Sequence, residues 1–97
     1  MTVPIIDLRT LLPWDVQTVM RSVEKTGKCL VLHEDTVVGG FGGEITAEIQ
    51  ERGFRFLDAP VMRAGSLDTP VPFNPVLEQQ FLAKNKLHEK IQQLLDY

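Results

Sequence analysis

The sequence has one cysteine, Cys29, which excludes an internal disulfide framework. Basic residues are also few, ten against thirteen acidic ones, and the formal net charge of −3 argues against a nucleic-acid-binding surface. No apolar run approaches the roughly 20 residues that span a bilayer, and the N-terminus lacks the pattern of a signal peptide. Because Cys29 lies in an apolar run, we expect a buried, reduced core residue of a cytoplasmic protein.

The 97 residues, 43% of them hydrophobic, can build one small domain around a single core. The apolar run from Cys29 to His33 predicts a buried strand. The glycine cluster Gly39–Gly43 follows and leads into a helix predicted from about Gly43 to Arg52, which Gly53 should cap. Strand, polar turn, glycines and helix are typical of a β-loop-α unit in a parallel sheet, which places ligands at the end of the strand.

The remaining segments extend this pattern into a single domain, residues 1–97. The sequence predicts a strand at Val3–Leu8 and then a helix from Val16 to Gly27, with Asp15 as its N-cap and Trp14 packed against it. A further strand is predicted at Phe54–Asp58, continuing to Arg63, and a last helix at about Asn85–Leu95. The proline-rich Thr69–Pro75 predicts an extended loop. This order predicts an α/β fold with a largely parallel sheet.

The glycine cluster is the first candidate site, because free amides before a helix can bind a phosphate. It lacks the lysine and hydroxyl residue of a P-loop and the spacing of a dinucleotide-binding motif, and Glu44 would repel an anion. The alternative is a packing role, in which the glycines allow close approach to another backbone. A free-standing small-ligand or nucleotide-binding domain that uses the Gly39–Gly43 loop is therefore an alternative function.

His33, Glu34 and Asp35 form the second candidate, since a histidine beside carboxylates can perform acid–base chemistry or bind a metal. Successive strand residues point to opposite faces, so His33 and Glu34 cannot easily converge on one ligand. His88 is distant in the sequence, and no metal-ligand spacing is present. We expect no catalytic residue and no metal site here, and a hydrogen-bonded His33 at the end of its strand.

Several motifs, taken together, resemble one protein family over nearly the whole chain. They occur in the order Ile6–Asp15, Ser22–Gly27, His33–Glu34, Gly39–Ile45 and Leu57–Val61, followed by Asp68–Pro72 and a terminal Tyr97. In this order they resemble the C-terminal, transketolase-like domain of the β subunit of thiamine-diphosphate-dependent 2-oxo acid dehydrogenases. The combination of Pro13-Trp14-Asp15 with His33-Glu34 is more similar to the branched-chain (2-oxoisovalerate) type than to the pyruvate type.

The resemblance implies a three-layer α/β/α domain of a larger enzyme that oxidatively decarboxylates 2-oxo acids and passes the acyl group to a lipoyl arm. Thiamine diphosphate and magnesium belong to that parent enzyme, and the resemblance implies that this domain binds neither. It implies an assembly role instead, with α and β subunits and the subunit-binding domain of the dihydrolipoyl acyltransferase as partners, and a homo-oligomer as a further possibility. The expected location is the cytoplasm, or the mitochondrial matrix in a eukaryote.

The same resemblance assigns candidate interaction residues. In related complexes docking uses an acidic residue before an Ala-Pro pair and the terminal carboxylate of the β subunit, which would be Asp58 and Tyr97 here. Carboxylates that face a basic partner increase the association rate and fix its register. A structural role for Asp58, bonded to loop amides at a strand end, is the alternative. The further loop or interface candidates are His33, Glu34, Gly39, Gly40 and Phe41.

The chain departs from the family pattern at Asp35–Val38 and Met62–Leu67, and it lacks the strand and helix with which the family domain begins. In the family that strand is central and pairs with the counterparts of both Val3–Leu8 and Cys29–His33. Without it, backbone groups would lack partners and an apolar slot would open. We therefore expect either a rearranged sheet or an oligomer that fills the gap.

Overall fold

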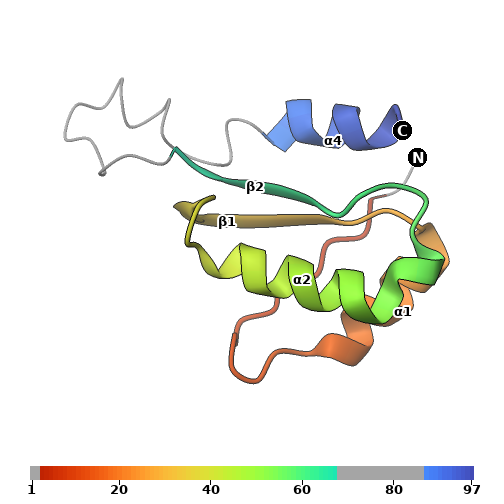
Figure 1. Ribbon diagram of the computed structural model, residues 1–97, viewed down its shortest axis with the longest axis horizontal. Coiled ribbons are helices and arrows are strands. Elements are labelled where there is room, and N and C mark those ends of the chain that lie inside the picture. Colours follow the sequence, from red (N-terminus) through yellow and green to blue (C-terminus); the bar gives the residue numbers. More distant parts are fainter. Residues whose placement is uncertain (1–2, 68–86) are drawn as a thin grey trace.

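The computed structural model describes residues 3–67 and 87–97 (Figure 1). Its helices and strands are, in chain order, α1 (Val16–Thr26), β1 (Leu30–Thr36), α2 (Phe41–Gly53), the short 3-10 helix η1 (Phe54–Phe56), β2 (Met62–Ser66) and α4 (Leu87–Leu95). The two strands pair in parallel, with Leu30 opposite Met62 and an irregularity between Leu32 and Thr36. This arrangement confirms the predicted parallel βαβ unit, in which α2 is the crossover helix.

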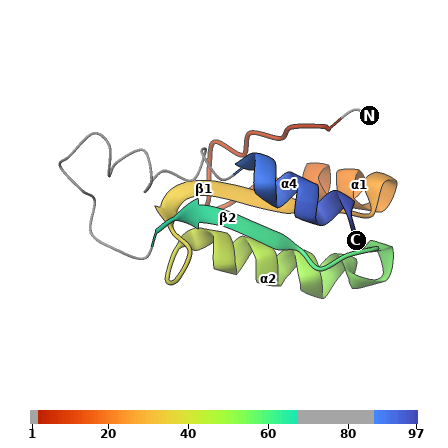
Figure 2. The ribbon, with the colours of Figure 1, turned by 90° about the horizontal axis from the view of Figure 1, so that it is seen from above.

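The elements form three layers. Figure 1 shows α4 on one side of the strands and α2 with α1 on the other, and the view in Figure 2 again has α2 and α4 on opposite sides of the pair. The main core lies between α1, α2 and the sheet, where Val19, Val23, Ile45 and Ile49 are buried together. The structure thus confirms the predicted α/β class and its three layers.

Local signals at both ends of α1 explain why this helix forms where the sequence predicts it. The Asp15 carboxylate accepts hydrogen bonds from the amide of Thr18 at 3.2 Å and from its hydroxyl at 2.7 Å. These two bonds lower the pKa of Asp15, so the cap is retained until the pH falls through that lowered value. At the other end Gly27 adopts the left-handed conformation (φ 76°) and donates its N–H to Val23.

The predicted strand at Val3–Leu8 is wrong, because residues 3–13 form neither helix nor strand. A strand needs a neighbour to pair with, and β2 is the one strand that pairs with β1 among the described residues. The segment is attached through side chains instead: Leu8 and Trp14 pack against the core, and Trp14 Nε1 donates to Glu48 on α2 at 2.9 Å. Ile5 is left 91% exposed. The segment therefore does not join the sheet of the described residues.

The predicted strand at Phe54–Asp58 is also wrong, because the chain continues from α2 into η1 and the second strand begins at Met62. Gly53 does not end the helical path: the next residue, Phe54, still has helical dihedrals. Instead, Gly53 allows close packing, since a Cβ there would meet the Met20 side chain. The strand β1 runs to Thr36, beyond the predicted end at His33.

The last helix begins at Leu87 in the described residues, close to its predicted start, and ends at Leu95 as predicted. The first part of that prediction and the predicted loop at Thr69–Pro75 lie outside the described residues. No helix within residues 3–67 or 87–97 is long and apolar enough to cross a membrane.

Candidate functional site

The candidate residues fall into two groups, at the two ends of β1. His33 lies in the middle of β1, whereas Gly39 and Gly40 lie in the loop after its carboxyl end and Phe41 begins α2. Asp58 and Tyr97 lie at the other end, where β1 begins. A seven-residue strand separates its two ends by about 20 Å, so no single small ligand contacts both groups.

At the carboxyl end the glycines make room for the imidazole of His33. A Cβ at Gly42 would overlap the His33 ring, and one at Gly40 would overlap both that ring and the Thr36 carbonyl. This close approach confirms the packing interpretation for Gly40 and Gly42. Gly39 has a different reason to be glycine, because its φ is +78° and nothing lies near its missing Cβ.

His33 is only partly satisfied by hydrogen bonds. Its Nδ1 accepts from the Asp35 amide at 3.1 Å, which confirms the predicted hydrogen bonding, although His33 lies inside β1 and not at its end. Its Nε2 is buried and has no hydrogen-bond partner in the described part of the chain, and the same is true of the Thr46 hydroxyl. Glu34 is exposed on the opposite face, and its carbonyl accepts from Ser66. His33 and Glu34 therefore do not converge on one ligand, as the strand geometry predicts.

We expect Gly42→Ala to lower the free energy of unfolding by about 1–3 kcal/mol, because the added methyl group would displace a packed imidazole. Gly43→Ala is the matched control. Its Cβ would meet only Arg63 Nη1 at 3.5 Å, so the gain in helix propensity should raise stability by about 0.5–1 kcal/mol. Urea denaturation followed by circular dichroism measures both changes, and equal effects would contradict the packing role of Gly42.

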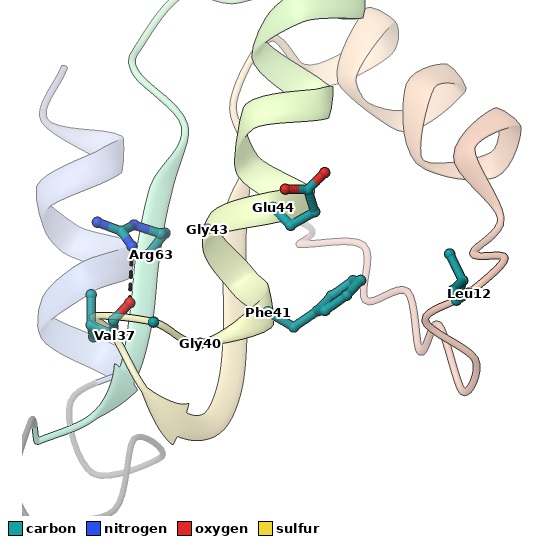
Figure 3. A pocket seen from close by; sticks show the side chains of 8 residues that line it. Leu12, Val37, Gly40, Phe41, Gly43, Glu44 and Arg63 are labelled. Carbon is teal, nitrogen blue, oxygen red and sulfur yellow. Dashed lines mark hydrogen bonds between the residues drawn. The ribbon is translucent and has the colours of Figure 1, made fainter.

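An open hollow of about 610 Å³ lies at the start of α2 (Figure 3). Its charged side chains do not converge: Figure 3 shows Glu44 and Phe41 directed away from Arg63. Arg63 Nη1 is already engaged, donating to the Val37 carbonyl at 3.0 Å. Leu12, which lines the far side of the hollow, is 92% exposed. The hollow thus offers an anion one helix N-terminus beside a carboxylate, which is a weak arrangement.

Neither end of the strand fits a metal cofactor. Residues 3–67 and 87–97 contain no group of three histidine, cysteine, aspartate or glutamate side chains placed to hold a metal ion. Cys29 is half-buried and packs against the core, and burial raises the pKa of its thiol. The thiol is therefore protonated at neutral pH and is a poor nucleophile or ligand. These properties agree with the predicted core role of Cys29.

At the amino end of β1 the structure brings Asp58 and the C-terminus to the same edge of the molecule. The Asp58 amide donates to the Gly27 carbonyl at 2.7 Å, and Lys28 Nζ donates to the Leu95 carbonyl at 3.3 Å. Both views show the C-terminus beside the loop that precedes β2 (Figures 1 and 2). Two adjacent residues, Gly27 and Lys28, therefore connect the Asp58 segment with the last turn of α4.

This edge concentrates negative charge. Asp58 is exposed, its carboxylate lies against Gly27 at the end of α1, and it has no hydrogen bond or ion pair in the described part of the chain. The alternative role, in which loop amides bind this carboxylate, is not observed among those residues. Tyr97, two residues after the end of α4, is 68% exposed. The carbonyl ends of α1 and α4 also lie here, with Lys25 in the last turn of α1 and Lys28 bonded to the Leu95 carbonyl. The edge is suited to a cationic partner.

Comparison with known proteins identifies the family. Residues 1–86 match the family described as "Transketolase, C-terminal domain". The chain belongs to this family. The match covers every described element except α4, and it agrees with the parallel sheet and the three layers.

Individual relatives indicate which members of the family the chain resembles. The chain is 49% identical to 2-oxoisovalerate dehydrogenase subunit beta 2, mitochondrial, of Arabidopsis thaliana, over 96% of this chain and 26% of the relative. It is 48% identical to 2-oxoisovalerate dehydrogenase subunit beta of Pseudomonas aeruginosa, over 70% of this chain and 19% of the relative. It is 38% identical to pyruvate dehydrogenase E1 component subunit beta of Staphylococcus aureus, over 99% of this chain and 30% of the relative. The chain therefore spans less than a third of each relative.

These findings confirm the resemblance to the C-terminal domain of a 2-oxo acid dehydrogenase β subunit, with higher identity to the branched-chain type than to the pyruvate type. The same resemblance made Asp58 and Tyr97 candidates, whereas nothing in the sequence singled out Lys28. The contact of Lys28 with Leu95 joins residues 67 positions apart, and no local pattern signals such a pair.

Proposed function

We propose that this chain is a non-catalytic assembly domain of the decarboxylating component of a branched-chain 2-oxo acid dehydrogenase complex. Its role is to dock the subunit-binding domain of the dihydrolipoyl acyltransferase through Asp58 and the terminal carboxylate of Tyr97. The observation that supports the proposal is that the Asp58 segment and the last turn of α4 are bonded to two adjacent residues, Gly27 and Lys28, at one edge. They are 30 to 70 positions from that dipeptide in the sequence, so the fold alone brings their segments to this edge.

The chemistry of the edge supports a basic partner. An exposed carboxylate without an ion pair in the described residues keeps its full capacity to accept charge-assisted hydrogen bonds from arginine or lysine. Such a carboxylate also raises the association rate of a cationic partner. This arrangement costs some stability in the free chain, since a carboxylate beside a helix C-terminus is unfavourable. A bound cation would offset that cost.

The rest of the proposal concerns the parent enzyme. Oxidative decarboxylation of a 2-oxo acid and acyl transfer to the lipoyl group belong to the whole enzyme, which uses thiamine diphosphate and magnesium. This domain binds neither and packs against α and β subunits, in the cytoplasm or the mitochondrial matrix. The single strand neighbour of β1 in the described residues also favours a homo-oligomer in which another segment pairs with this strand.

The direct test is titration of the 97-residue chain with a purified acyltransferase subunit-binding domain, followed by calorimetry. We expect Asp58→Asn to weaken binding by roughly ten- to a hundredfold, the value of one charge-assisted hydrogen bond. Glu44→Gln removes the same charge at the opposite end of α2 and should change affinity by less than about twofold. Absence of binding by the unaltered chain, or equal losses in both variants, would refute the proposal.

Sedimentation of the same mixtures adds the mass of the complex and of the free chain. A species larger than the monomer that gains mass with the partner agrees with both parts of the proposal. A compact monomer whose mass does not change when the partner is added contradicts the docking role.

The alternative function, a small-ligand or nucleotide-binding domain, is supported by one observation, the hollow of about 610 Å³ at the start of α2. Nucleotide titration followed by NMR distinguishes it, because a bound phosphate would shift the amide signals of residues 40–44. We favour the assembly role, since the glycines at this position accommodate His33 and Glu44 opposes an anion.

A further inference from the structure

The contact of Lys28 with α4 provides a basic group at the C-terminal end of this helix. The last turn of α4 contains no basic residue, although a cation there would stabilise the exposed carbonyls and the negative end of the dipole. Lys28 supplies that cation from elsewhere in the chain, and its Nζ donates to the carbonyl of Leu95, the last residue of the helix. Only Asp96 separates Leu95 from Tyr97.

Lys28 is also fixed relative to Asp58. It follows Gly27 directly, and the Gly27 carbonyl accepts the hydrogen bond from the Asp58 amide at 2.7 Å. We infer that Lys28 is a positioning residue of the docking edge, which holds the last turn of α4 so that the Tyr97 carboxylate and Asp58 reach a basic partner together. This inference rests on the proposed function, and it adds a residue that the family resemblance does not assign.

A positioning role and a simple charge effect predict opposite results. If Lys28 acted only through its charge, it would repel a basic partner, and its removal would tighten binding. If it positions the C-terminus, its removal lets the last turn of α4 fray, and the partner must then order that turn again on binding. The second case predicts weaker binding although the edge has become more negative.

The experiment compares Lys28→Gln, Lys28→Arg and Lys25→Gln in calorimetric titrations with the acyltransferase subunit-binding domain. Lys25 is the matched control, because it is exposed in the last turn of α1 and carries the same charge. We expect Lys28→Gln to weaken binding about three- to tenfold, the usual value of one hydrogen bond. Lys25→Gln should leave binding unchanged or slightly tighter. Lys28→Arg should restore affinity, because a guanidinium can also donate to the Leu95 carbonyl.

A second measurement tests the contact without any partner. Hydrogen exchange of the Asp96 and Tyr97 amides, which bond to Gln92 and Leu94 in the last turn, should be faster in Lys28→Gln and unchanged in Lys25→Gln. If the unaltered chain binds no partner, the proposed function fails while the exchange result still decides whether Lys28 holds the turn. If the chain binds and Lys28→Gln behaves as Lys25→Gln does in both measurements, the positioning role is overturned.

Discussion

Replacing Ile49 by alanine is expected to lower the free energy of unfolding by about 2–5 kcal/mol. Ile49 is 1% exposed and lies in the cluster of α1 and α2 residues on which the sheet rests. A domain of this size has a total stability near the lower end of the usual 5–15 kcal/mol, so the substitution should leave a measurable unfolded fraction without denaturant. Urea denaturation followed by circular dichroism and by Trp14 fluorescence measures the change.

Two further variants separate the core effect from a general loss of apolar surface. Ile49→Val removes one methyl group and should cost about 0.5–1.5 kcal/mol. Leu32→Ala, in β1, removes a side chain that is 44% exposed and should cost clearly less than Ile49→Ala. If Leu32→Ala were as damaging as Ile49→Ala, the main core would not lie between α1, α2 and the sheet.

The predictable part of the fold is the part encoded by neighbours in sequence. The Asp15 cap, the left-handed Gly27 and the apolar spacing between them are local signals, and α1 forms where they place it. The glycine cluster marks the turn from β1 into α2 for a similar reason, since only residues without a Cβ accommodate the His33 ring there. Such signals act before any tertiary contact forms.

The wrong predictions concern segments whose state depends on a neighbour elsewhere in the chain. Val3–Leu8 has the apolar pattern of a strand, but a strand forms only beside another strand, and none pairs with it among the described residues. Phe54–Phe56 is rich in aromatic residues that favour strands, yet it follows α2 directly and continues the helical path as η1. In both cases the preference of the residues for a strand is overridden by the surroundings of the segment in the fold.

The candidate site also has a part that the sequence predicts and a part that it does not. Asp58 and Tyr97 were selected as candidates by resemblance, while the geometry of their segments depends on the hydrogen bond that Gly27 accepts from Asp58 and on the one that Lys28 donates to Leu95. The bond from Trp14 to Glu48 is a similar case, because Glu48 has the spacing of an outward-facing helix residue. Sequence patterns report which residues are polar and exposed, but they do not report which of them meet.

Replacing Gly27 by alanine should affect both stability and docking, because two separate constraints meet at this position. Its φ of +76° costs a residue with a Cβ about 1–2 kcal/mol. In addition, the new methyl group would overlap the Asp58 carboxylate. Asp58 is exposed and can rotate away, so the overlap changes the position of the carboxylate more than it changes stability. We therefore expect an affinity loss of roughly ten- to a hundredfold, as for Asp58→Asn.

Gly39→Ala provides the matched control for this prediction. Gly39 has nearly the same dihedral, φ +78°, but nothing lies within 4 Å of its added Cβ. Both variants should lose about 1–2 kcal/mol of stability from the backbone alone, and only Gly27→Ala should lose affinity for the subunit-binding domain. Denaturation and calorimetry on the same two proteins separate the two effects. Equal affinities would mean that the carboxylate of Asp58 does not contact the partner from the position it has beside Gly27, and docking would then depend on the C-terminus alone.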